Sequence, residues 1–171
     1  MRFIKVFLSA VFLFAFFNAY AKPITGAFGY KLGQYIPSWE GTGWSKVDDF
    51  KDNLFDELLI WALPKSKKLY RITAQKILTR CDDSNEFEAL TQILRDKYPG
   101  PYKLDPRLQY TAGSGFTHEN DGKRVSLSCV NSVMLLVYED LELKKKVEEE
   151  LQSIKQKKVE ALKEKIDASK L

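Results

Sequence analysis

The stretch that decides the fold is FTHENDGKRVSLSCVNSVMLLVY, residues 116–138. Its Asp121-Gly122 dipeptide lies between two β-like segments, which is a strong short-range signal for a β-hairpin. Residues 123–130 alternate apolar and polar side chains, as in a strand with one buried face. After a second turn, residues 133–138 are apolar on both faces, which favours a strand inside a sheet. The stretch therefore predicts three consecutive antiparallel strands.

A second hairpin is predicted upstream. Residues 56–63 are apolar on both faces, residues 64–67 form a Pro-Lys-Ser-Lys turn, and residues 69–78 alternate so that one face is wet. Residues 23–34, with glycines among aromatic and aliphatic side chains, predict an opening strand. Residues 108–112 give a weaker strand signal. Together these segments predict an antiparallel sheet of about five or six strands.

Two helices are expected beside this sheet. Asp83 and Glu86 are spaced as a capping box, which predicts a helix start. The apolar side of this helix is predicted from Phe87, Leu90, Ile93, Leu94 and Tyr98. A long helix is predicted from about Leu141 to the C-terminus. Its apolar stripe consists of Val147, Leu151, Ile154, Leu162 and Ile166, with Lys158 interrupting it.

The predicted fold class is therefore α+β: an antiparallel sheet, one packed helix and a long C-terminal helix. We expect residues 22–154 to form the domain. Residues 155–171 are expected to project as a helical tail, because the apolar stripe breaks at Lys158. A partner or a second copy of the chain could cover the rest of the stripe, so self-association through this helix is a further expectation.

Residues 1–21 are typical of a secretory signal peptide. Arg2 and Lys5 precede a short apolar run, and Ala19-Tyr20-Ala21 matches the small-x-small pattern of a signal peptidase site. The run is shorter than the roughly 20 apolar residues that span a bilayer, although an uncleaved anchor is the alternative. We expect a periplasmic or secreted protein beginning at Lys22, with no membrane span after cleavage.

The two cysteines fit an oxidising compartment. Cys81 and Cys129 are predicted to form one disulfide, which would close a loop of about 48 residues and stabilise the fold by on the order of 4 kcal/mol. The competing interpretation is a pair of free buried thiols. A redox pair is disfavoured because the cysteines form no C-x-x-C motif.

Charge argues against a nucleic-acid partner. Without Arg2 and Lys5 the 27 basic residues become 25, against 23 acidic residues. This balance favours neither nucleic acid nor an anionic membrane surface.

Several short motifs carry a resemblance to known proteins. They are Gly29-Tyr30-Lys31-Leu32-Gly33, Leu69-Tyr70-Arg71-Ile72, Cys81, residues 94–98, Cys129 and Tyr138-Glu139-Asp140-Leu141. In this order they resemble small exported bacterial proteins of unknown function. The glycine-bracketed opening segment is also similar to that of BamE-like outer-membrane assembly proteins, although the chain lacks their lipid-attachment cysteine. The resemblance implies no catalytic residue.

No catalytic residue, metal ligand or cofactor is expected. His118 is the sole histidine of the sequence, and we expect a solvated side chain on a strand, because a metal site needs several converging ligands. An acidic cluster is the second candidate, and solvated or helix-starting acids are the preferred interpretation. Its members are Asp48, Asp49, Asp52, Asp56 and Glu57.

The loop with Trp39 and Trp44 is the candidate binding site, because aromatic side chains near glycines can stack on a sugar or anchor a partner. The alternative is that both tryptophans cover an edge of the sheet. We predict a non-enzymatic exported protein that binds an unknown protein or glycan of the cell envelope. A carboxylate-dependent hydrolase or sugar-active enzyme is the alternative function.

Overall fold

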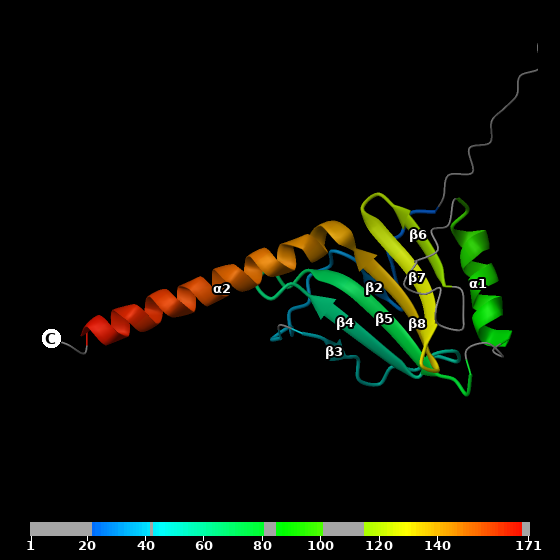
Figure 1. The fold of residues 1–171 in the computed structure, drawn as a ribbon, viewed down its shortest axis with the longest axis horizontal. Coiled ribbons are helices and arrows are strands. Elements are labelled where there is room, and N and C mark those ends of the chain that lie inside the picture. Colours follow the sequence, from blue (N-terminus) through cyan, green and yellow to red (C-terminus); the bar gives the residue numbers. More distant parts are fainter. Residues whose placement is uncertain (1–21, 42, 81–84, 101–114, 169–171) are drawn as a thin grey trace, which may run out of the picture.

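The computed structural model describes residues 22–41, 43–80, 85–100 and 115–168, with side chains as far as residue 165. The protein is α+β, as predicted, with a two-stranded sheet, a six-stranded sheet and two helices in the described residues. The strands are β1 (Gly26–Ala27), β2 (Tyr30–Lys31), β3 (Ser45–Lys46), β4 (Glu57–Ala62), β5 (Leu69–Ile77), β6 (Phe116–Asn120), β7 (Lys123–Val130) and β8 (Val133–Asp140). The helices are α1 (Asn85–Lys97) and α2 (Leu141–Ala168). Figure 1 shows the sheet between these two helices.

The large sheet is antiparallel throughout, in the order β3-β4-β5-β8-β7-β6. The predicted hairpins β4–β5 and β6–β7 and the following strand β8 are confirmed. Asp121 and Gly122 both have positive φ, 49° and 70°, which matches the type I′ turn that suits a two-residue hairpin loop. The last strand, β8, lies in the centre of the sheet between β5 and β7.

One face of the sheet is buried and the other is partly exposed. Residues of β7 and β8 alternate strictly along most of their length between these two environments. The buried face packs against α1 and the N-terminal segment in a single core. Its members include Ile24, Ile36, Trp39, Phe55, Ile72, Phe87, Leu94, Val125, Leu127 and Leu136. The partly exposed face is called the open face below.

The prediction of one opening strand over residues 23–34 is wrong. This segment instead forms a small hairpin of β1 and β2, in which Gly26 pairs with Lys31. A Cβ atom at Gly26 would lie 2.2 Å from the carbonyl oxygen of Tyr30, and its φ is +142°. Glycine is therefore required for the chain to fold back here.

Helix α1 buries most of the predicted apolar side, but Ile93 is 58% exposed. At roughly 100° per residue, Ile93 lies about 120° from Phe87, beyond the stripe that meets the sheet. Thr91 takes the buried position and its hydroxyl donates to the Phe87 carbonyl oxygen at 2.8 Å. The capping residue Asp83 and the weak strand at 108–112 lie outside the described residues.

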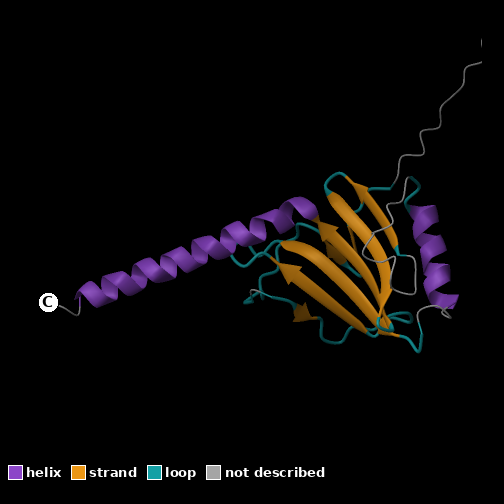
Figure 2. Ribbon diagram, viewed as in Figure 1, coloured by secondary structure: helices purple, strands orange, loops and turns teal. Residues whose placement is uncertain are grey.

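Helix α2 follows β8 directly. The Asp140 carboxylate accepts the backbone N–H of Leu143 at 2.9 Å and so caps the first turn. One side of the first half contacts the domain, whereas the side chains of 155–165 are all exposed. At about 1.5 Å per residue the 28 residues of α2 span roughly 42 Å, and Figure 2 shows the helix extending well beyond the sheet.

Candidate interaction surface

A line of five side chains crosses the open face from β4 to β6. The register of the strands places Trp61 opposite Arg71, Arg71 opposite Glu139, Glu139 opposite Arg124, and Arg124 opposite Glu119. Directly opposed residues of antiparallel strands lie close enough for their side chains to interact. We call this line of alternating charges, with an aromatic ring at one end, the transverse row.

Glu139 is the buried centre of the transverse row, with only 2% of its side chain exposed. Arg124 forms an ion pair with one carboxylate oxygen, and the Lys144 Nζ atom lies 2.8 Å from the other. Arg71 approaches the same carboxylate at 3.9 Å. Burial alone raises the pKa of Glu139, but hydrogen bonds and positive charge from Lys144 and Arg124 outweigh it and hold the pKa below its usual range. The carboxylate is therefore ionised at neutral pH.

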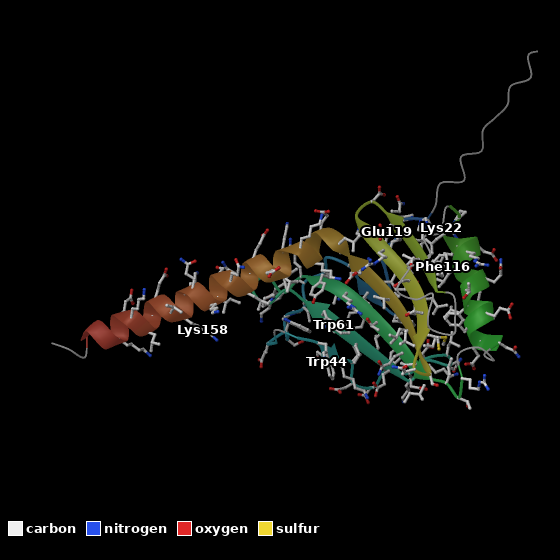
Figure 3. The ribbon with its side chains drawn as sticks, in the orientation of Figure 1. Lys22, Trp44, Trp61, Phe116, Glu119 and Lys158 are labelled. Atoms are coloured by element: carbon white, nitrogen blue, oxygen red, sulfur yellow. The ribbon has the colours of Figure 1, made fainter. Side chains whose placement is uncertain are left out.

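The aromatic end of the row lies beside a further, exposed tryptophan. The guanidinium of Arg71 lies 4.7 Å from the ring centroid of Trp61, a cation–π arrangement. Ser45 pairs with Ile60, so the register continued by one residue brings Trp44 opposite Trp61. Trp44 is 61% exposed. Figure 3 shows both tryptophans at the β3–β4 side, with Glu119 toward β6.

A strip of aliphatic and hydroxyl-bearing side chains adjoins the transverse row. Moving two residues along each strand brings Leu59, Thr73, Val137 and Ser126 into register across the same face. Thr73 is buried, whereas Leu59 and Val137 are partly exposed. Leu135 continues the strip on β8. The open face therefore combines aromatic, aliphatic and charged side chains on a surface made of regular strands.

The two predicted binding residues are separated by the fold. Trp39 belongs to the core at 4% exposure, and its indole N–H has no hydrogen-bond partner among the described residues. Trp44 lies on the open side. Sequence reasoning missed Trp61 and Arg71 as neighbours of Trp44. The sequence showed on which face of its own strand each residue lies. It did not show the register between strands that aligns Trp44, Trp61 and Arg71.

Asp52 and Asp56 of the acidic cluster have structural roles. Asp52 accepts the backbone N–H groups of Leu54 and Phe55, and Asp56 accepts that of Ile77. The interpretation of solvated acids agrees with the exposure of Asp48, Asp49, Asp52 and Asp56. The interpretation of helix-starting acids is wrong, because the Asp52 and Asp56 carboxylates stabilise a loop and a strand end rather than a helix in the described chain.

Glu57 of the same cluster receives hydrogen bonds from Lys46 and Gln75, and these lower its pKa. A general acid needs the opposite shift. Across the described residues, no group of three or more histidine, cysteine or acidic side chains is placed to hold a metal ion.

The expectation of a solvated His118 is also wrong. Its side chain is 6% exposed, and its ring stacks on that of Tyr98 at 5.6 Å. Neither ring nitrogen has a hydrogen-bond partner in the described part of the chain. Burial lowers the pKa of His118, because the charged form loses its hydration. The imidazole therefore serves as a neutral, packed ring.

The predicted disulfide falls partly outside the described residues, because Cys81 is one of those that are not described. Cys129 is completely buried on β7. Close to it, the Ser132 hydroxyl donates to the Thr79 carbonyl oxygen at 3.3 Å, and the backbone N–H of Leu78 donates to the Ser132 carbonyl oxygen at 2.7 Å. Thr79, two residues before Cys81, therefore lies next to the β7–β8 turn. The disulfide between Cys81 and Cys129 stays a prediction.

Comparisons with protein-family models, with curated proteins and with solved structures find no match to this chain. Neither described helix is both long enough and apolar enough to cross a membrane.

Proposed function

We propose that this chain is a non-enzymatic exported protein that binds another protein of the cell envelope through the open face of its sheet. The observation that carries the proposal is the cluster of Trp44, Trp61 and Arg71 beside the partly exposed Leu59 and Val137. Tryptophan and arginine are enriched among the residues that dominate binding energy at protein interfaces.

The ion pairs of the transverse row support a binding role for a rigid surface. Arg124 is held by its ion pair with Glu139, and Arg71 donates a hydrogen bond from Nε to the Thr73 hydroxyl at 3.2 Å, so both guanidinium groups are held in place before a partner arrives. A preorganised side chain loses less conformational freedom on binding. Leu59, Leu135 and Val137 of the adjoining strip add apolar area that a partner would remove from water.

A protein fits this surface better than a glycan does. The site lies on regular strands, and it combines aromatic and aliphatic side chains with charges of both signs, as protein interfaces do. One ring face of Trp61 is already covered by the guanidinium of Arg71. A sugar that stacked on that face would have to displace Arg71.

The alternative, a carboxylate-dependent hydrolase or sugar-active enzyme, needs two carboxylates with separated pKa values at one site. Asp52 and Asp56 instead accept backbone hydrogen bonds, and the pKa of Glu57 is lowered. These roles favour the binding function over the enzyme.

Site-specific photo-crosslinking in the native envelope tests the proposal. A photoreactive residue is placed at Trp44 or at Ser126 of the open face, with Gln92 on the exposed side of α1 as the matched control. We expect both open-face positions to yield the same protein adduct, identified by mass spectrometry, and Gln92 to yield none. Adducts of equal amount and identity from all three positions would contradict the proposal.

Export to the periplasm or medium is part of this proposal, and it rests on residues 1–21. Intact-mass measurement of the exported protein is expected to show Lys22 as its first residue. A membrane-bound species that retains Met1 would show instead that the segment is an anchor.

A further inference from the structure

The distal part of α2 presents a second surface, unconnected with the open face. Among residues 155–165 there are five lysines and two glutamates, so this segment carries a net charge of five minus two, or +3. All of these side chains are exposed. Val159 and Leu162 are 46% and 58% exposed, although both are apolar. Figure 3 shows Lys158 of this segment far from the sheet.

The charges are segregated around the helix. At roughly 100° per residue, four lysines fall within about 90° of the line between Val159 and Leu162. They are Lys155, Lys158, Lys163 and Lys165. Lys158 and Lys165 lie on one side of the line between Val159 and Leu162, and Lys163 lies on the other side. Lys155 lies on the same line, closer to the domain. Both glutamates, Glu160 and Glu164, lie more than about 120° away.

We propose that this face of α2, called the distal basic face, binds the surface of a lipid bilayer that carries anionic headgroups. Lysine side chains flanking an apolar stripe can bury their aliphatic stems while their ammonium groups reach the headgroups. Val159 and Leu162 would enter the interface between them. The acidic residues point away from the bilayer, where they are not repelled by it.

A second copy of the chain fits the distal basic face poorly. Both flanks of the stripe carry lysine, so parallel and antiparallel pairing alike would bring Lys158 or Lys163 near another lysine. Like charges at such positions destabilise helix pairs. The apolar stripe is also too short for a coiled coil, which needs apolar positions repeated over several heptads.

The proposal differs from what net charge alone suggests. The balance of 25 basic and 23 acidic residues beyond residue 21 gave no reason to expect an anionic surface as partner. The positive charge is concentrated on one exposed face at the end of a helix that extends beyond the domain. Attraction to a charged surface depends on this local arrangement, because it decays within about 10 Å at moderate salt.

Vesicle flotation tests the proposal with the chain that begins at Lys22. The vesicles contain equal parts phosphatidylglycerol and phosphatidylcholine, and vesicles of phosphatidylcholine alone serve as the comparison. Replacing Lys158 and Lys163 with glutamine should weaken binding to the anionic vesicles more than tenfold, at about fivefold per lysine. The matched control replaces Lys146 and Lys157, which lie on the far side of α2, and should change binding less than threefold.

A second pair of variants tests the apolar stripe. Leu162→Asp should abolish flotation, whereas Ala161→Asp on the far side should not, and circular dichroism should show equal helix content in the two. Equal binding to both kinds of vesicle would overturn the proposal. So would binding to soluble polyglutamate as strong as to the anionic vesicles, which would assign the face to an acidic protein. Self-association lost only in Leu162→Asp, without vesicle binding, would assign it to a second copy.

Discussion

The Glu150 carboxylate on α2 accepts the backbone N–H of Lys65 at 2.6 Å, although 85 residues separate the two in sequence. The same oxygen accepts the N–H of Ser66 at 3.1 Å. These residues form the turn between β4 and β5. The bonds lower the pKa of Glu150 against the opposing effect of its partial burial. They attach the first half of the long helix to the β4–β5 turn at the end of the sheet.

Removal of this attachment is expected to loosen α2. Glu150→Ala should reduce the free energy of unfolding by about 1 kcal/mol, because two backbone donors lose a charged acceptor but regain water. Urea denaturation measures the change, and hydrogen exchange should become faster at Lys65 and Ser66. The exposed neighbour Glu149→Ala is the control, with little effect expected. Unchanged exchange at the turn would show that other contacts hold α2.

Loss of Arg124 is expected to destabilise the transverse row more strongly. Arg124→Met keeps the aliphatic stem but removes one partner of the buried Glu139, leaving Lys144 and Arg71. Breaking a buried ion pair costs about 3–5 kcal/mol, and the remaining cations should reduce this to about 2 kcal/mol. The double variant Arg124→Met with Glu139→Gln should recover part of the loss. No recovery would mean that the charge of Glu139 is not the cause.

Acid is expected to weaken the fold through His118. Its pKa in the folded state is below the ordinary value of 6.5, so the unfolded chain binds a proton first as the pH falls. Stability is therefore present above pH 6.5 and is lost as the pH falls below it toward the folded pKa. Denaturation midpoints between pH 7.5 and about pH 5 should show this fall, and His118→Phe should reduce it. An equal slope in the variant would assign the effect to other groups.

The disulfide between Cys81 and Cys129 remains a prediction. Mass spectrometry of the unreduced, proteolysed protein should detect one linked peptide pair. Reduction should lower the free energy of unfolding by up to about 4 kcal/mol, because a loop of about 48 residues is released. Two alkylatable thiols in unreduced protein would contradict the pairing.

The distal tail is expected to contribute little to stability. Deletion of residues 156–171 removes exposed side chains from 156 to 165 and should leave the melting temperature within about 2 °C, as surface changes usually do. The same deletion should abolish binding to anionic vesicles. A large fall in melting temperature would show that the tail belongs to the folded core.

The elements that the sequence predicted are those with a simple local period. β7 is recognisable because Val125, Leu127 and Cys129 alternate with polar residues, and α2 because its apolar residues recur at helical spacing. The transverse row could not be found in this way. Arg71 lies opposite Glu139 because of the register in which β5 pairs with β8. The alternation of residues within each strand does not determine that register.

Burial was also hard to predict for single polar residues. His118 and Thr73 lie on strands that carry both polar and apolar residues. Whether their side chains are exposed depends on how α1 and the adjacent strands pack against them. Trp39 and Trp44 are five residues apart in one loop. Trp39 is buried in the core, whereas Trp44 is exposed on the surface.

The central position of β8 has a consequence for the order in which the molecule assembles. Arg71 and Glu139, which are paired across β5 and β8, are 139 minus 71, or 68, residues apart. Before β8 has folded into the sheet, β5 and β7 each have one edge whose backbone hydrogen-bonding groups are unpaired. Strands β3, β4 and β5 are then not joined to strands β7 and β6. Closing so long a loop is entropically costly and slows folding. The N-terminal part of the domain is therefore completed only by β8, the last strand in the described part of the chain, and chains interrupted before Asp140 should be open to aggregation or proteolysis.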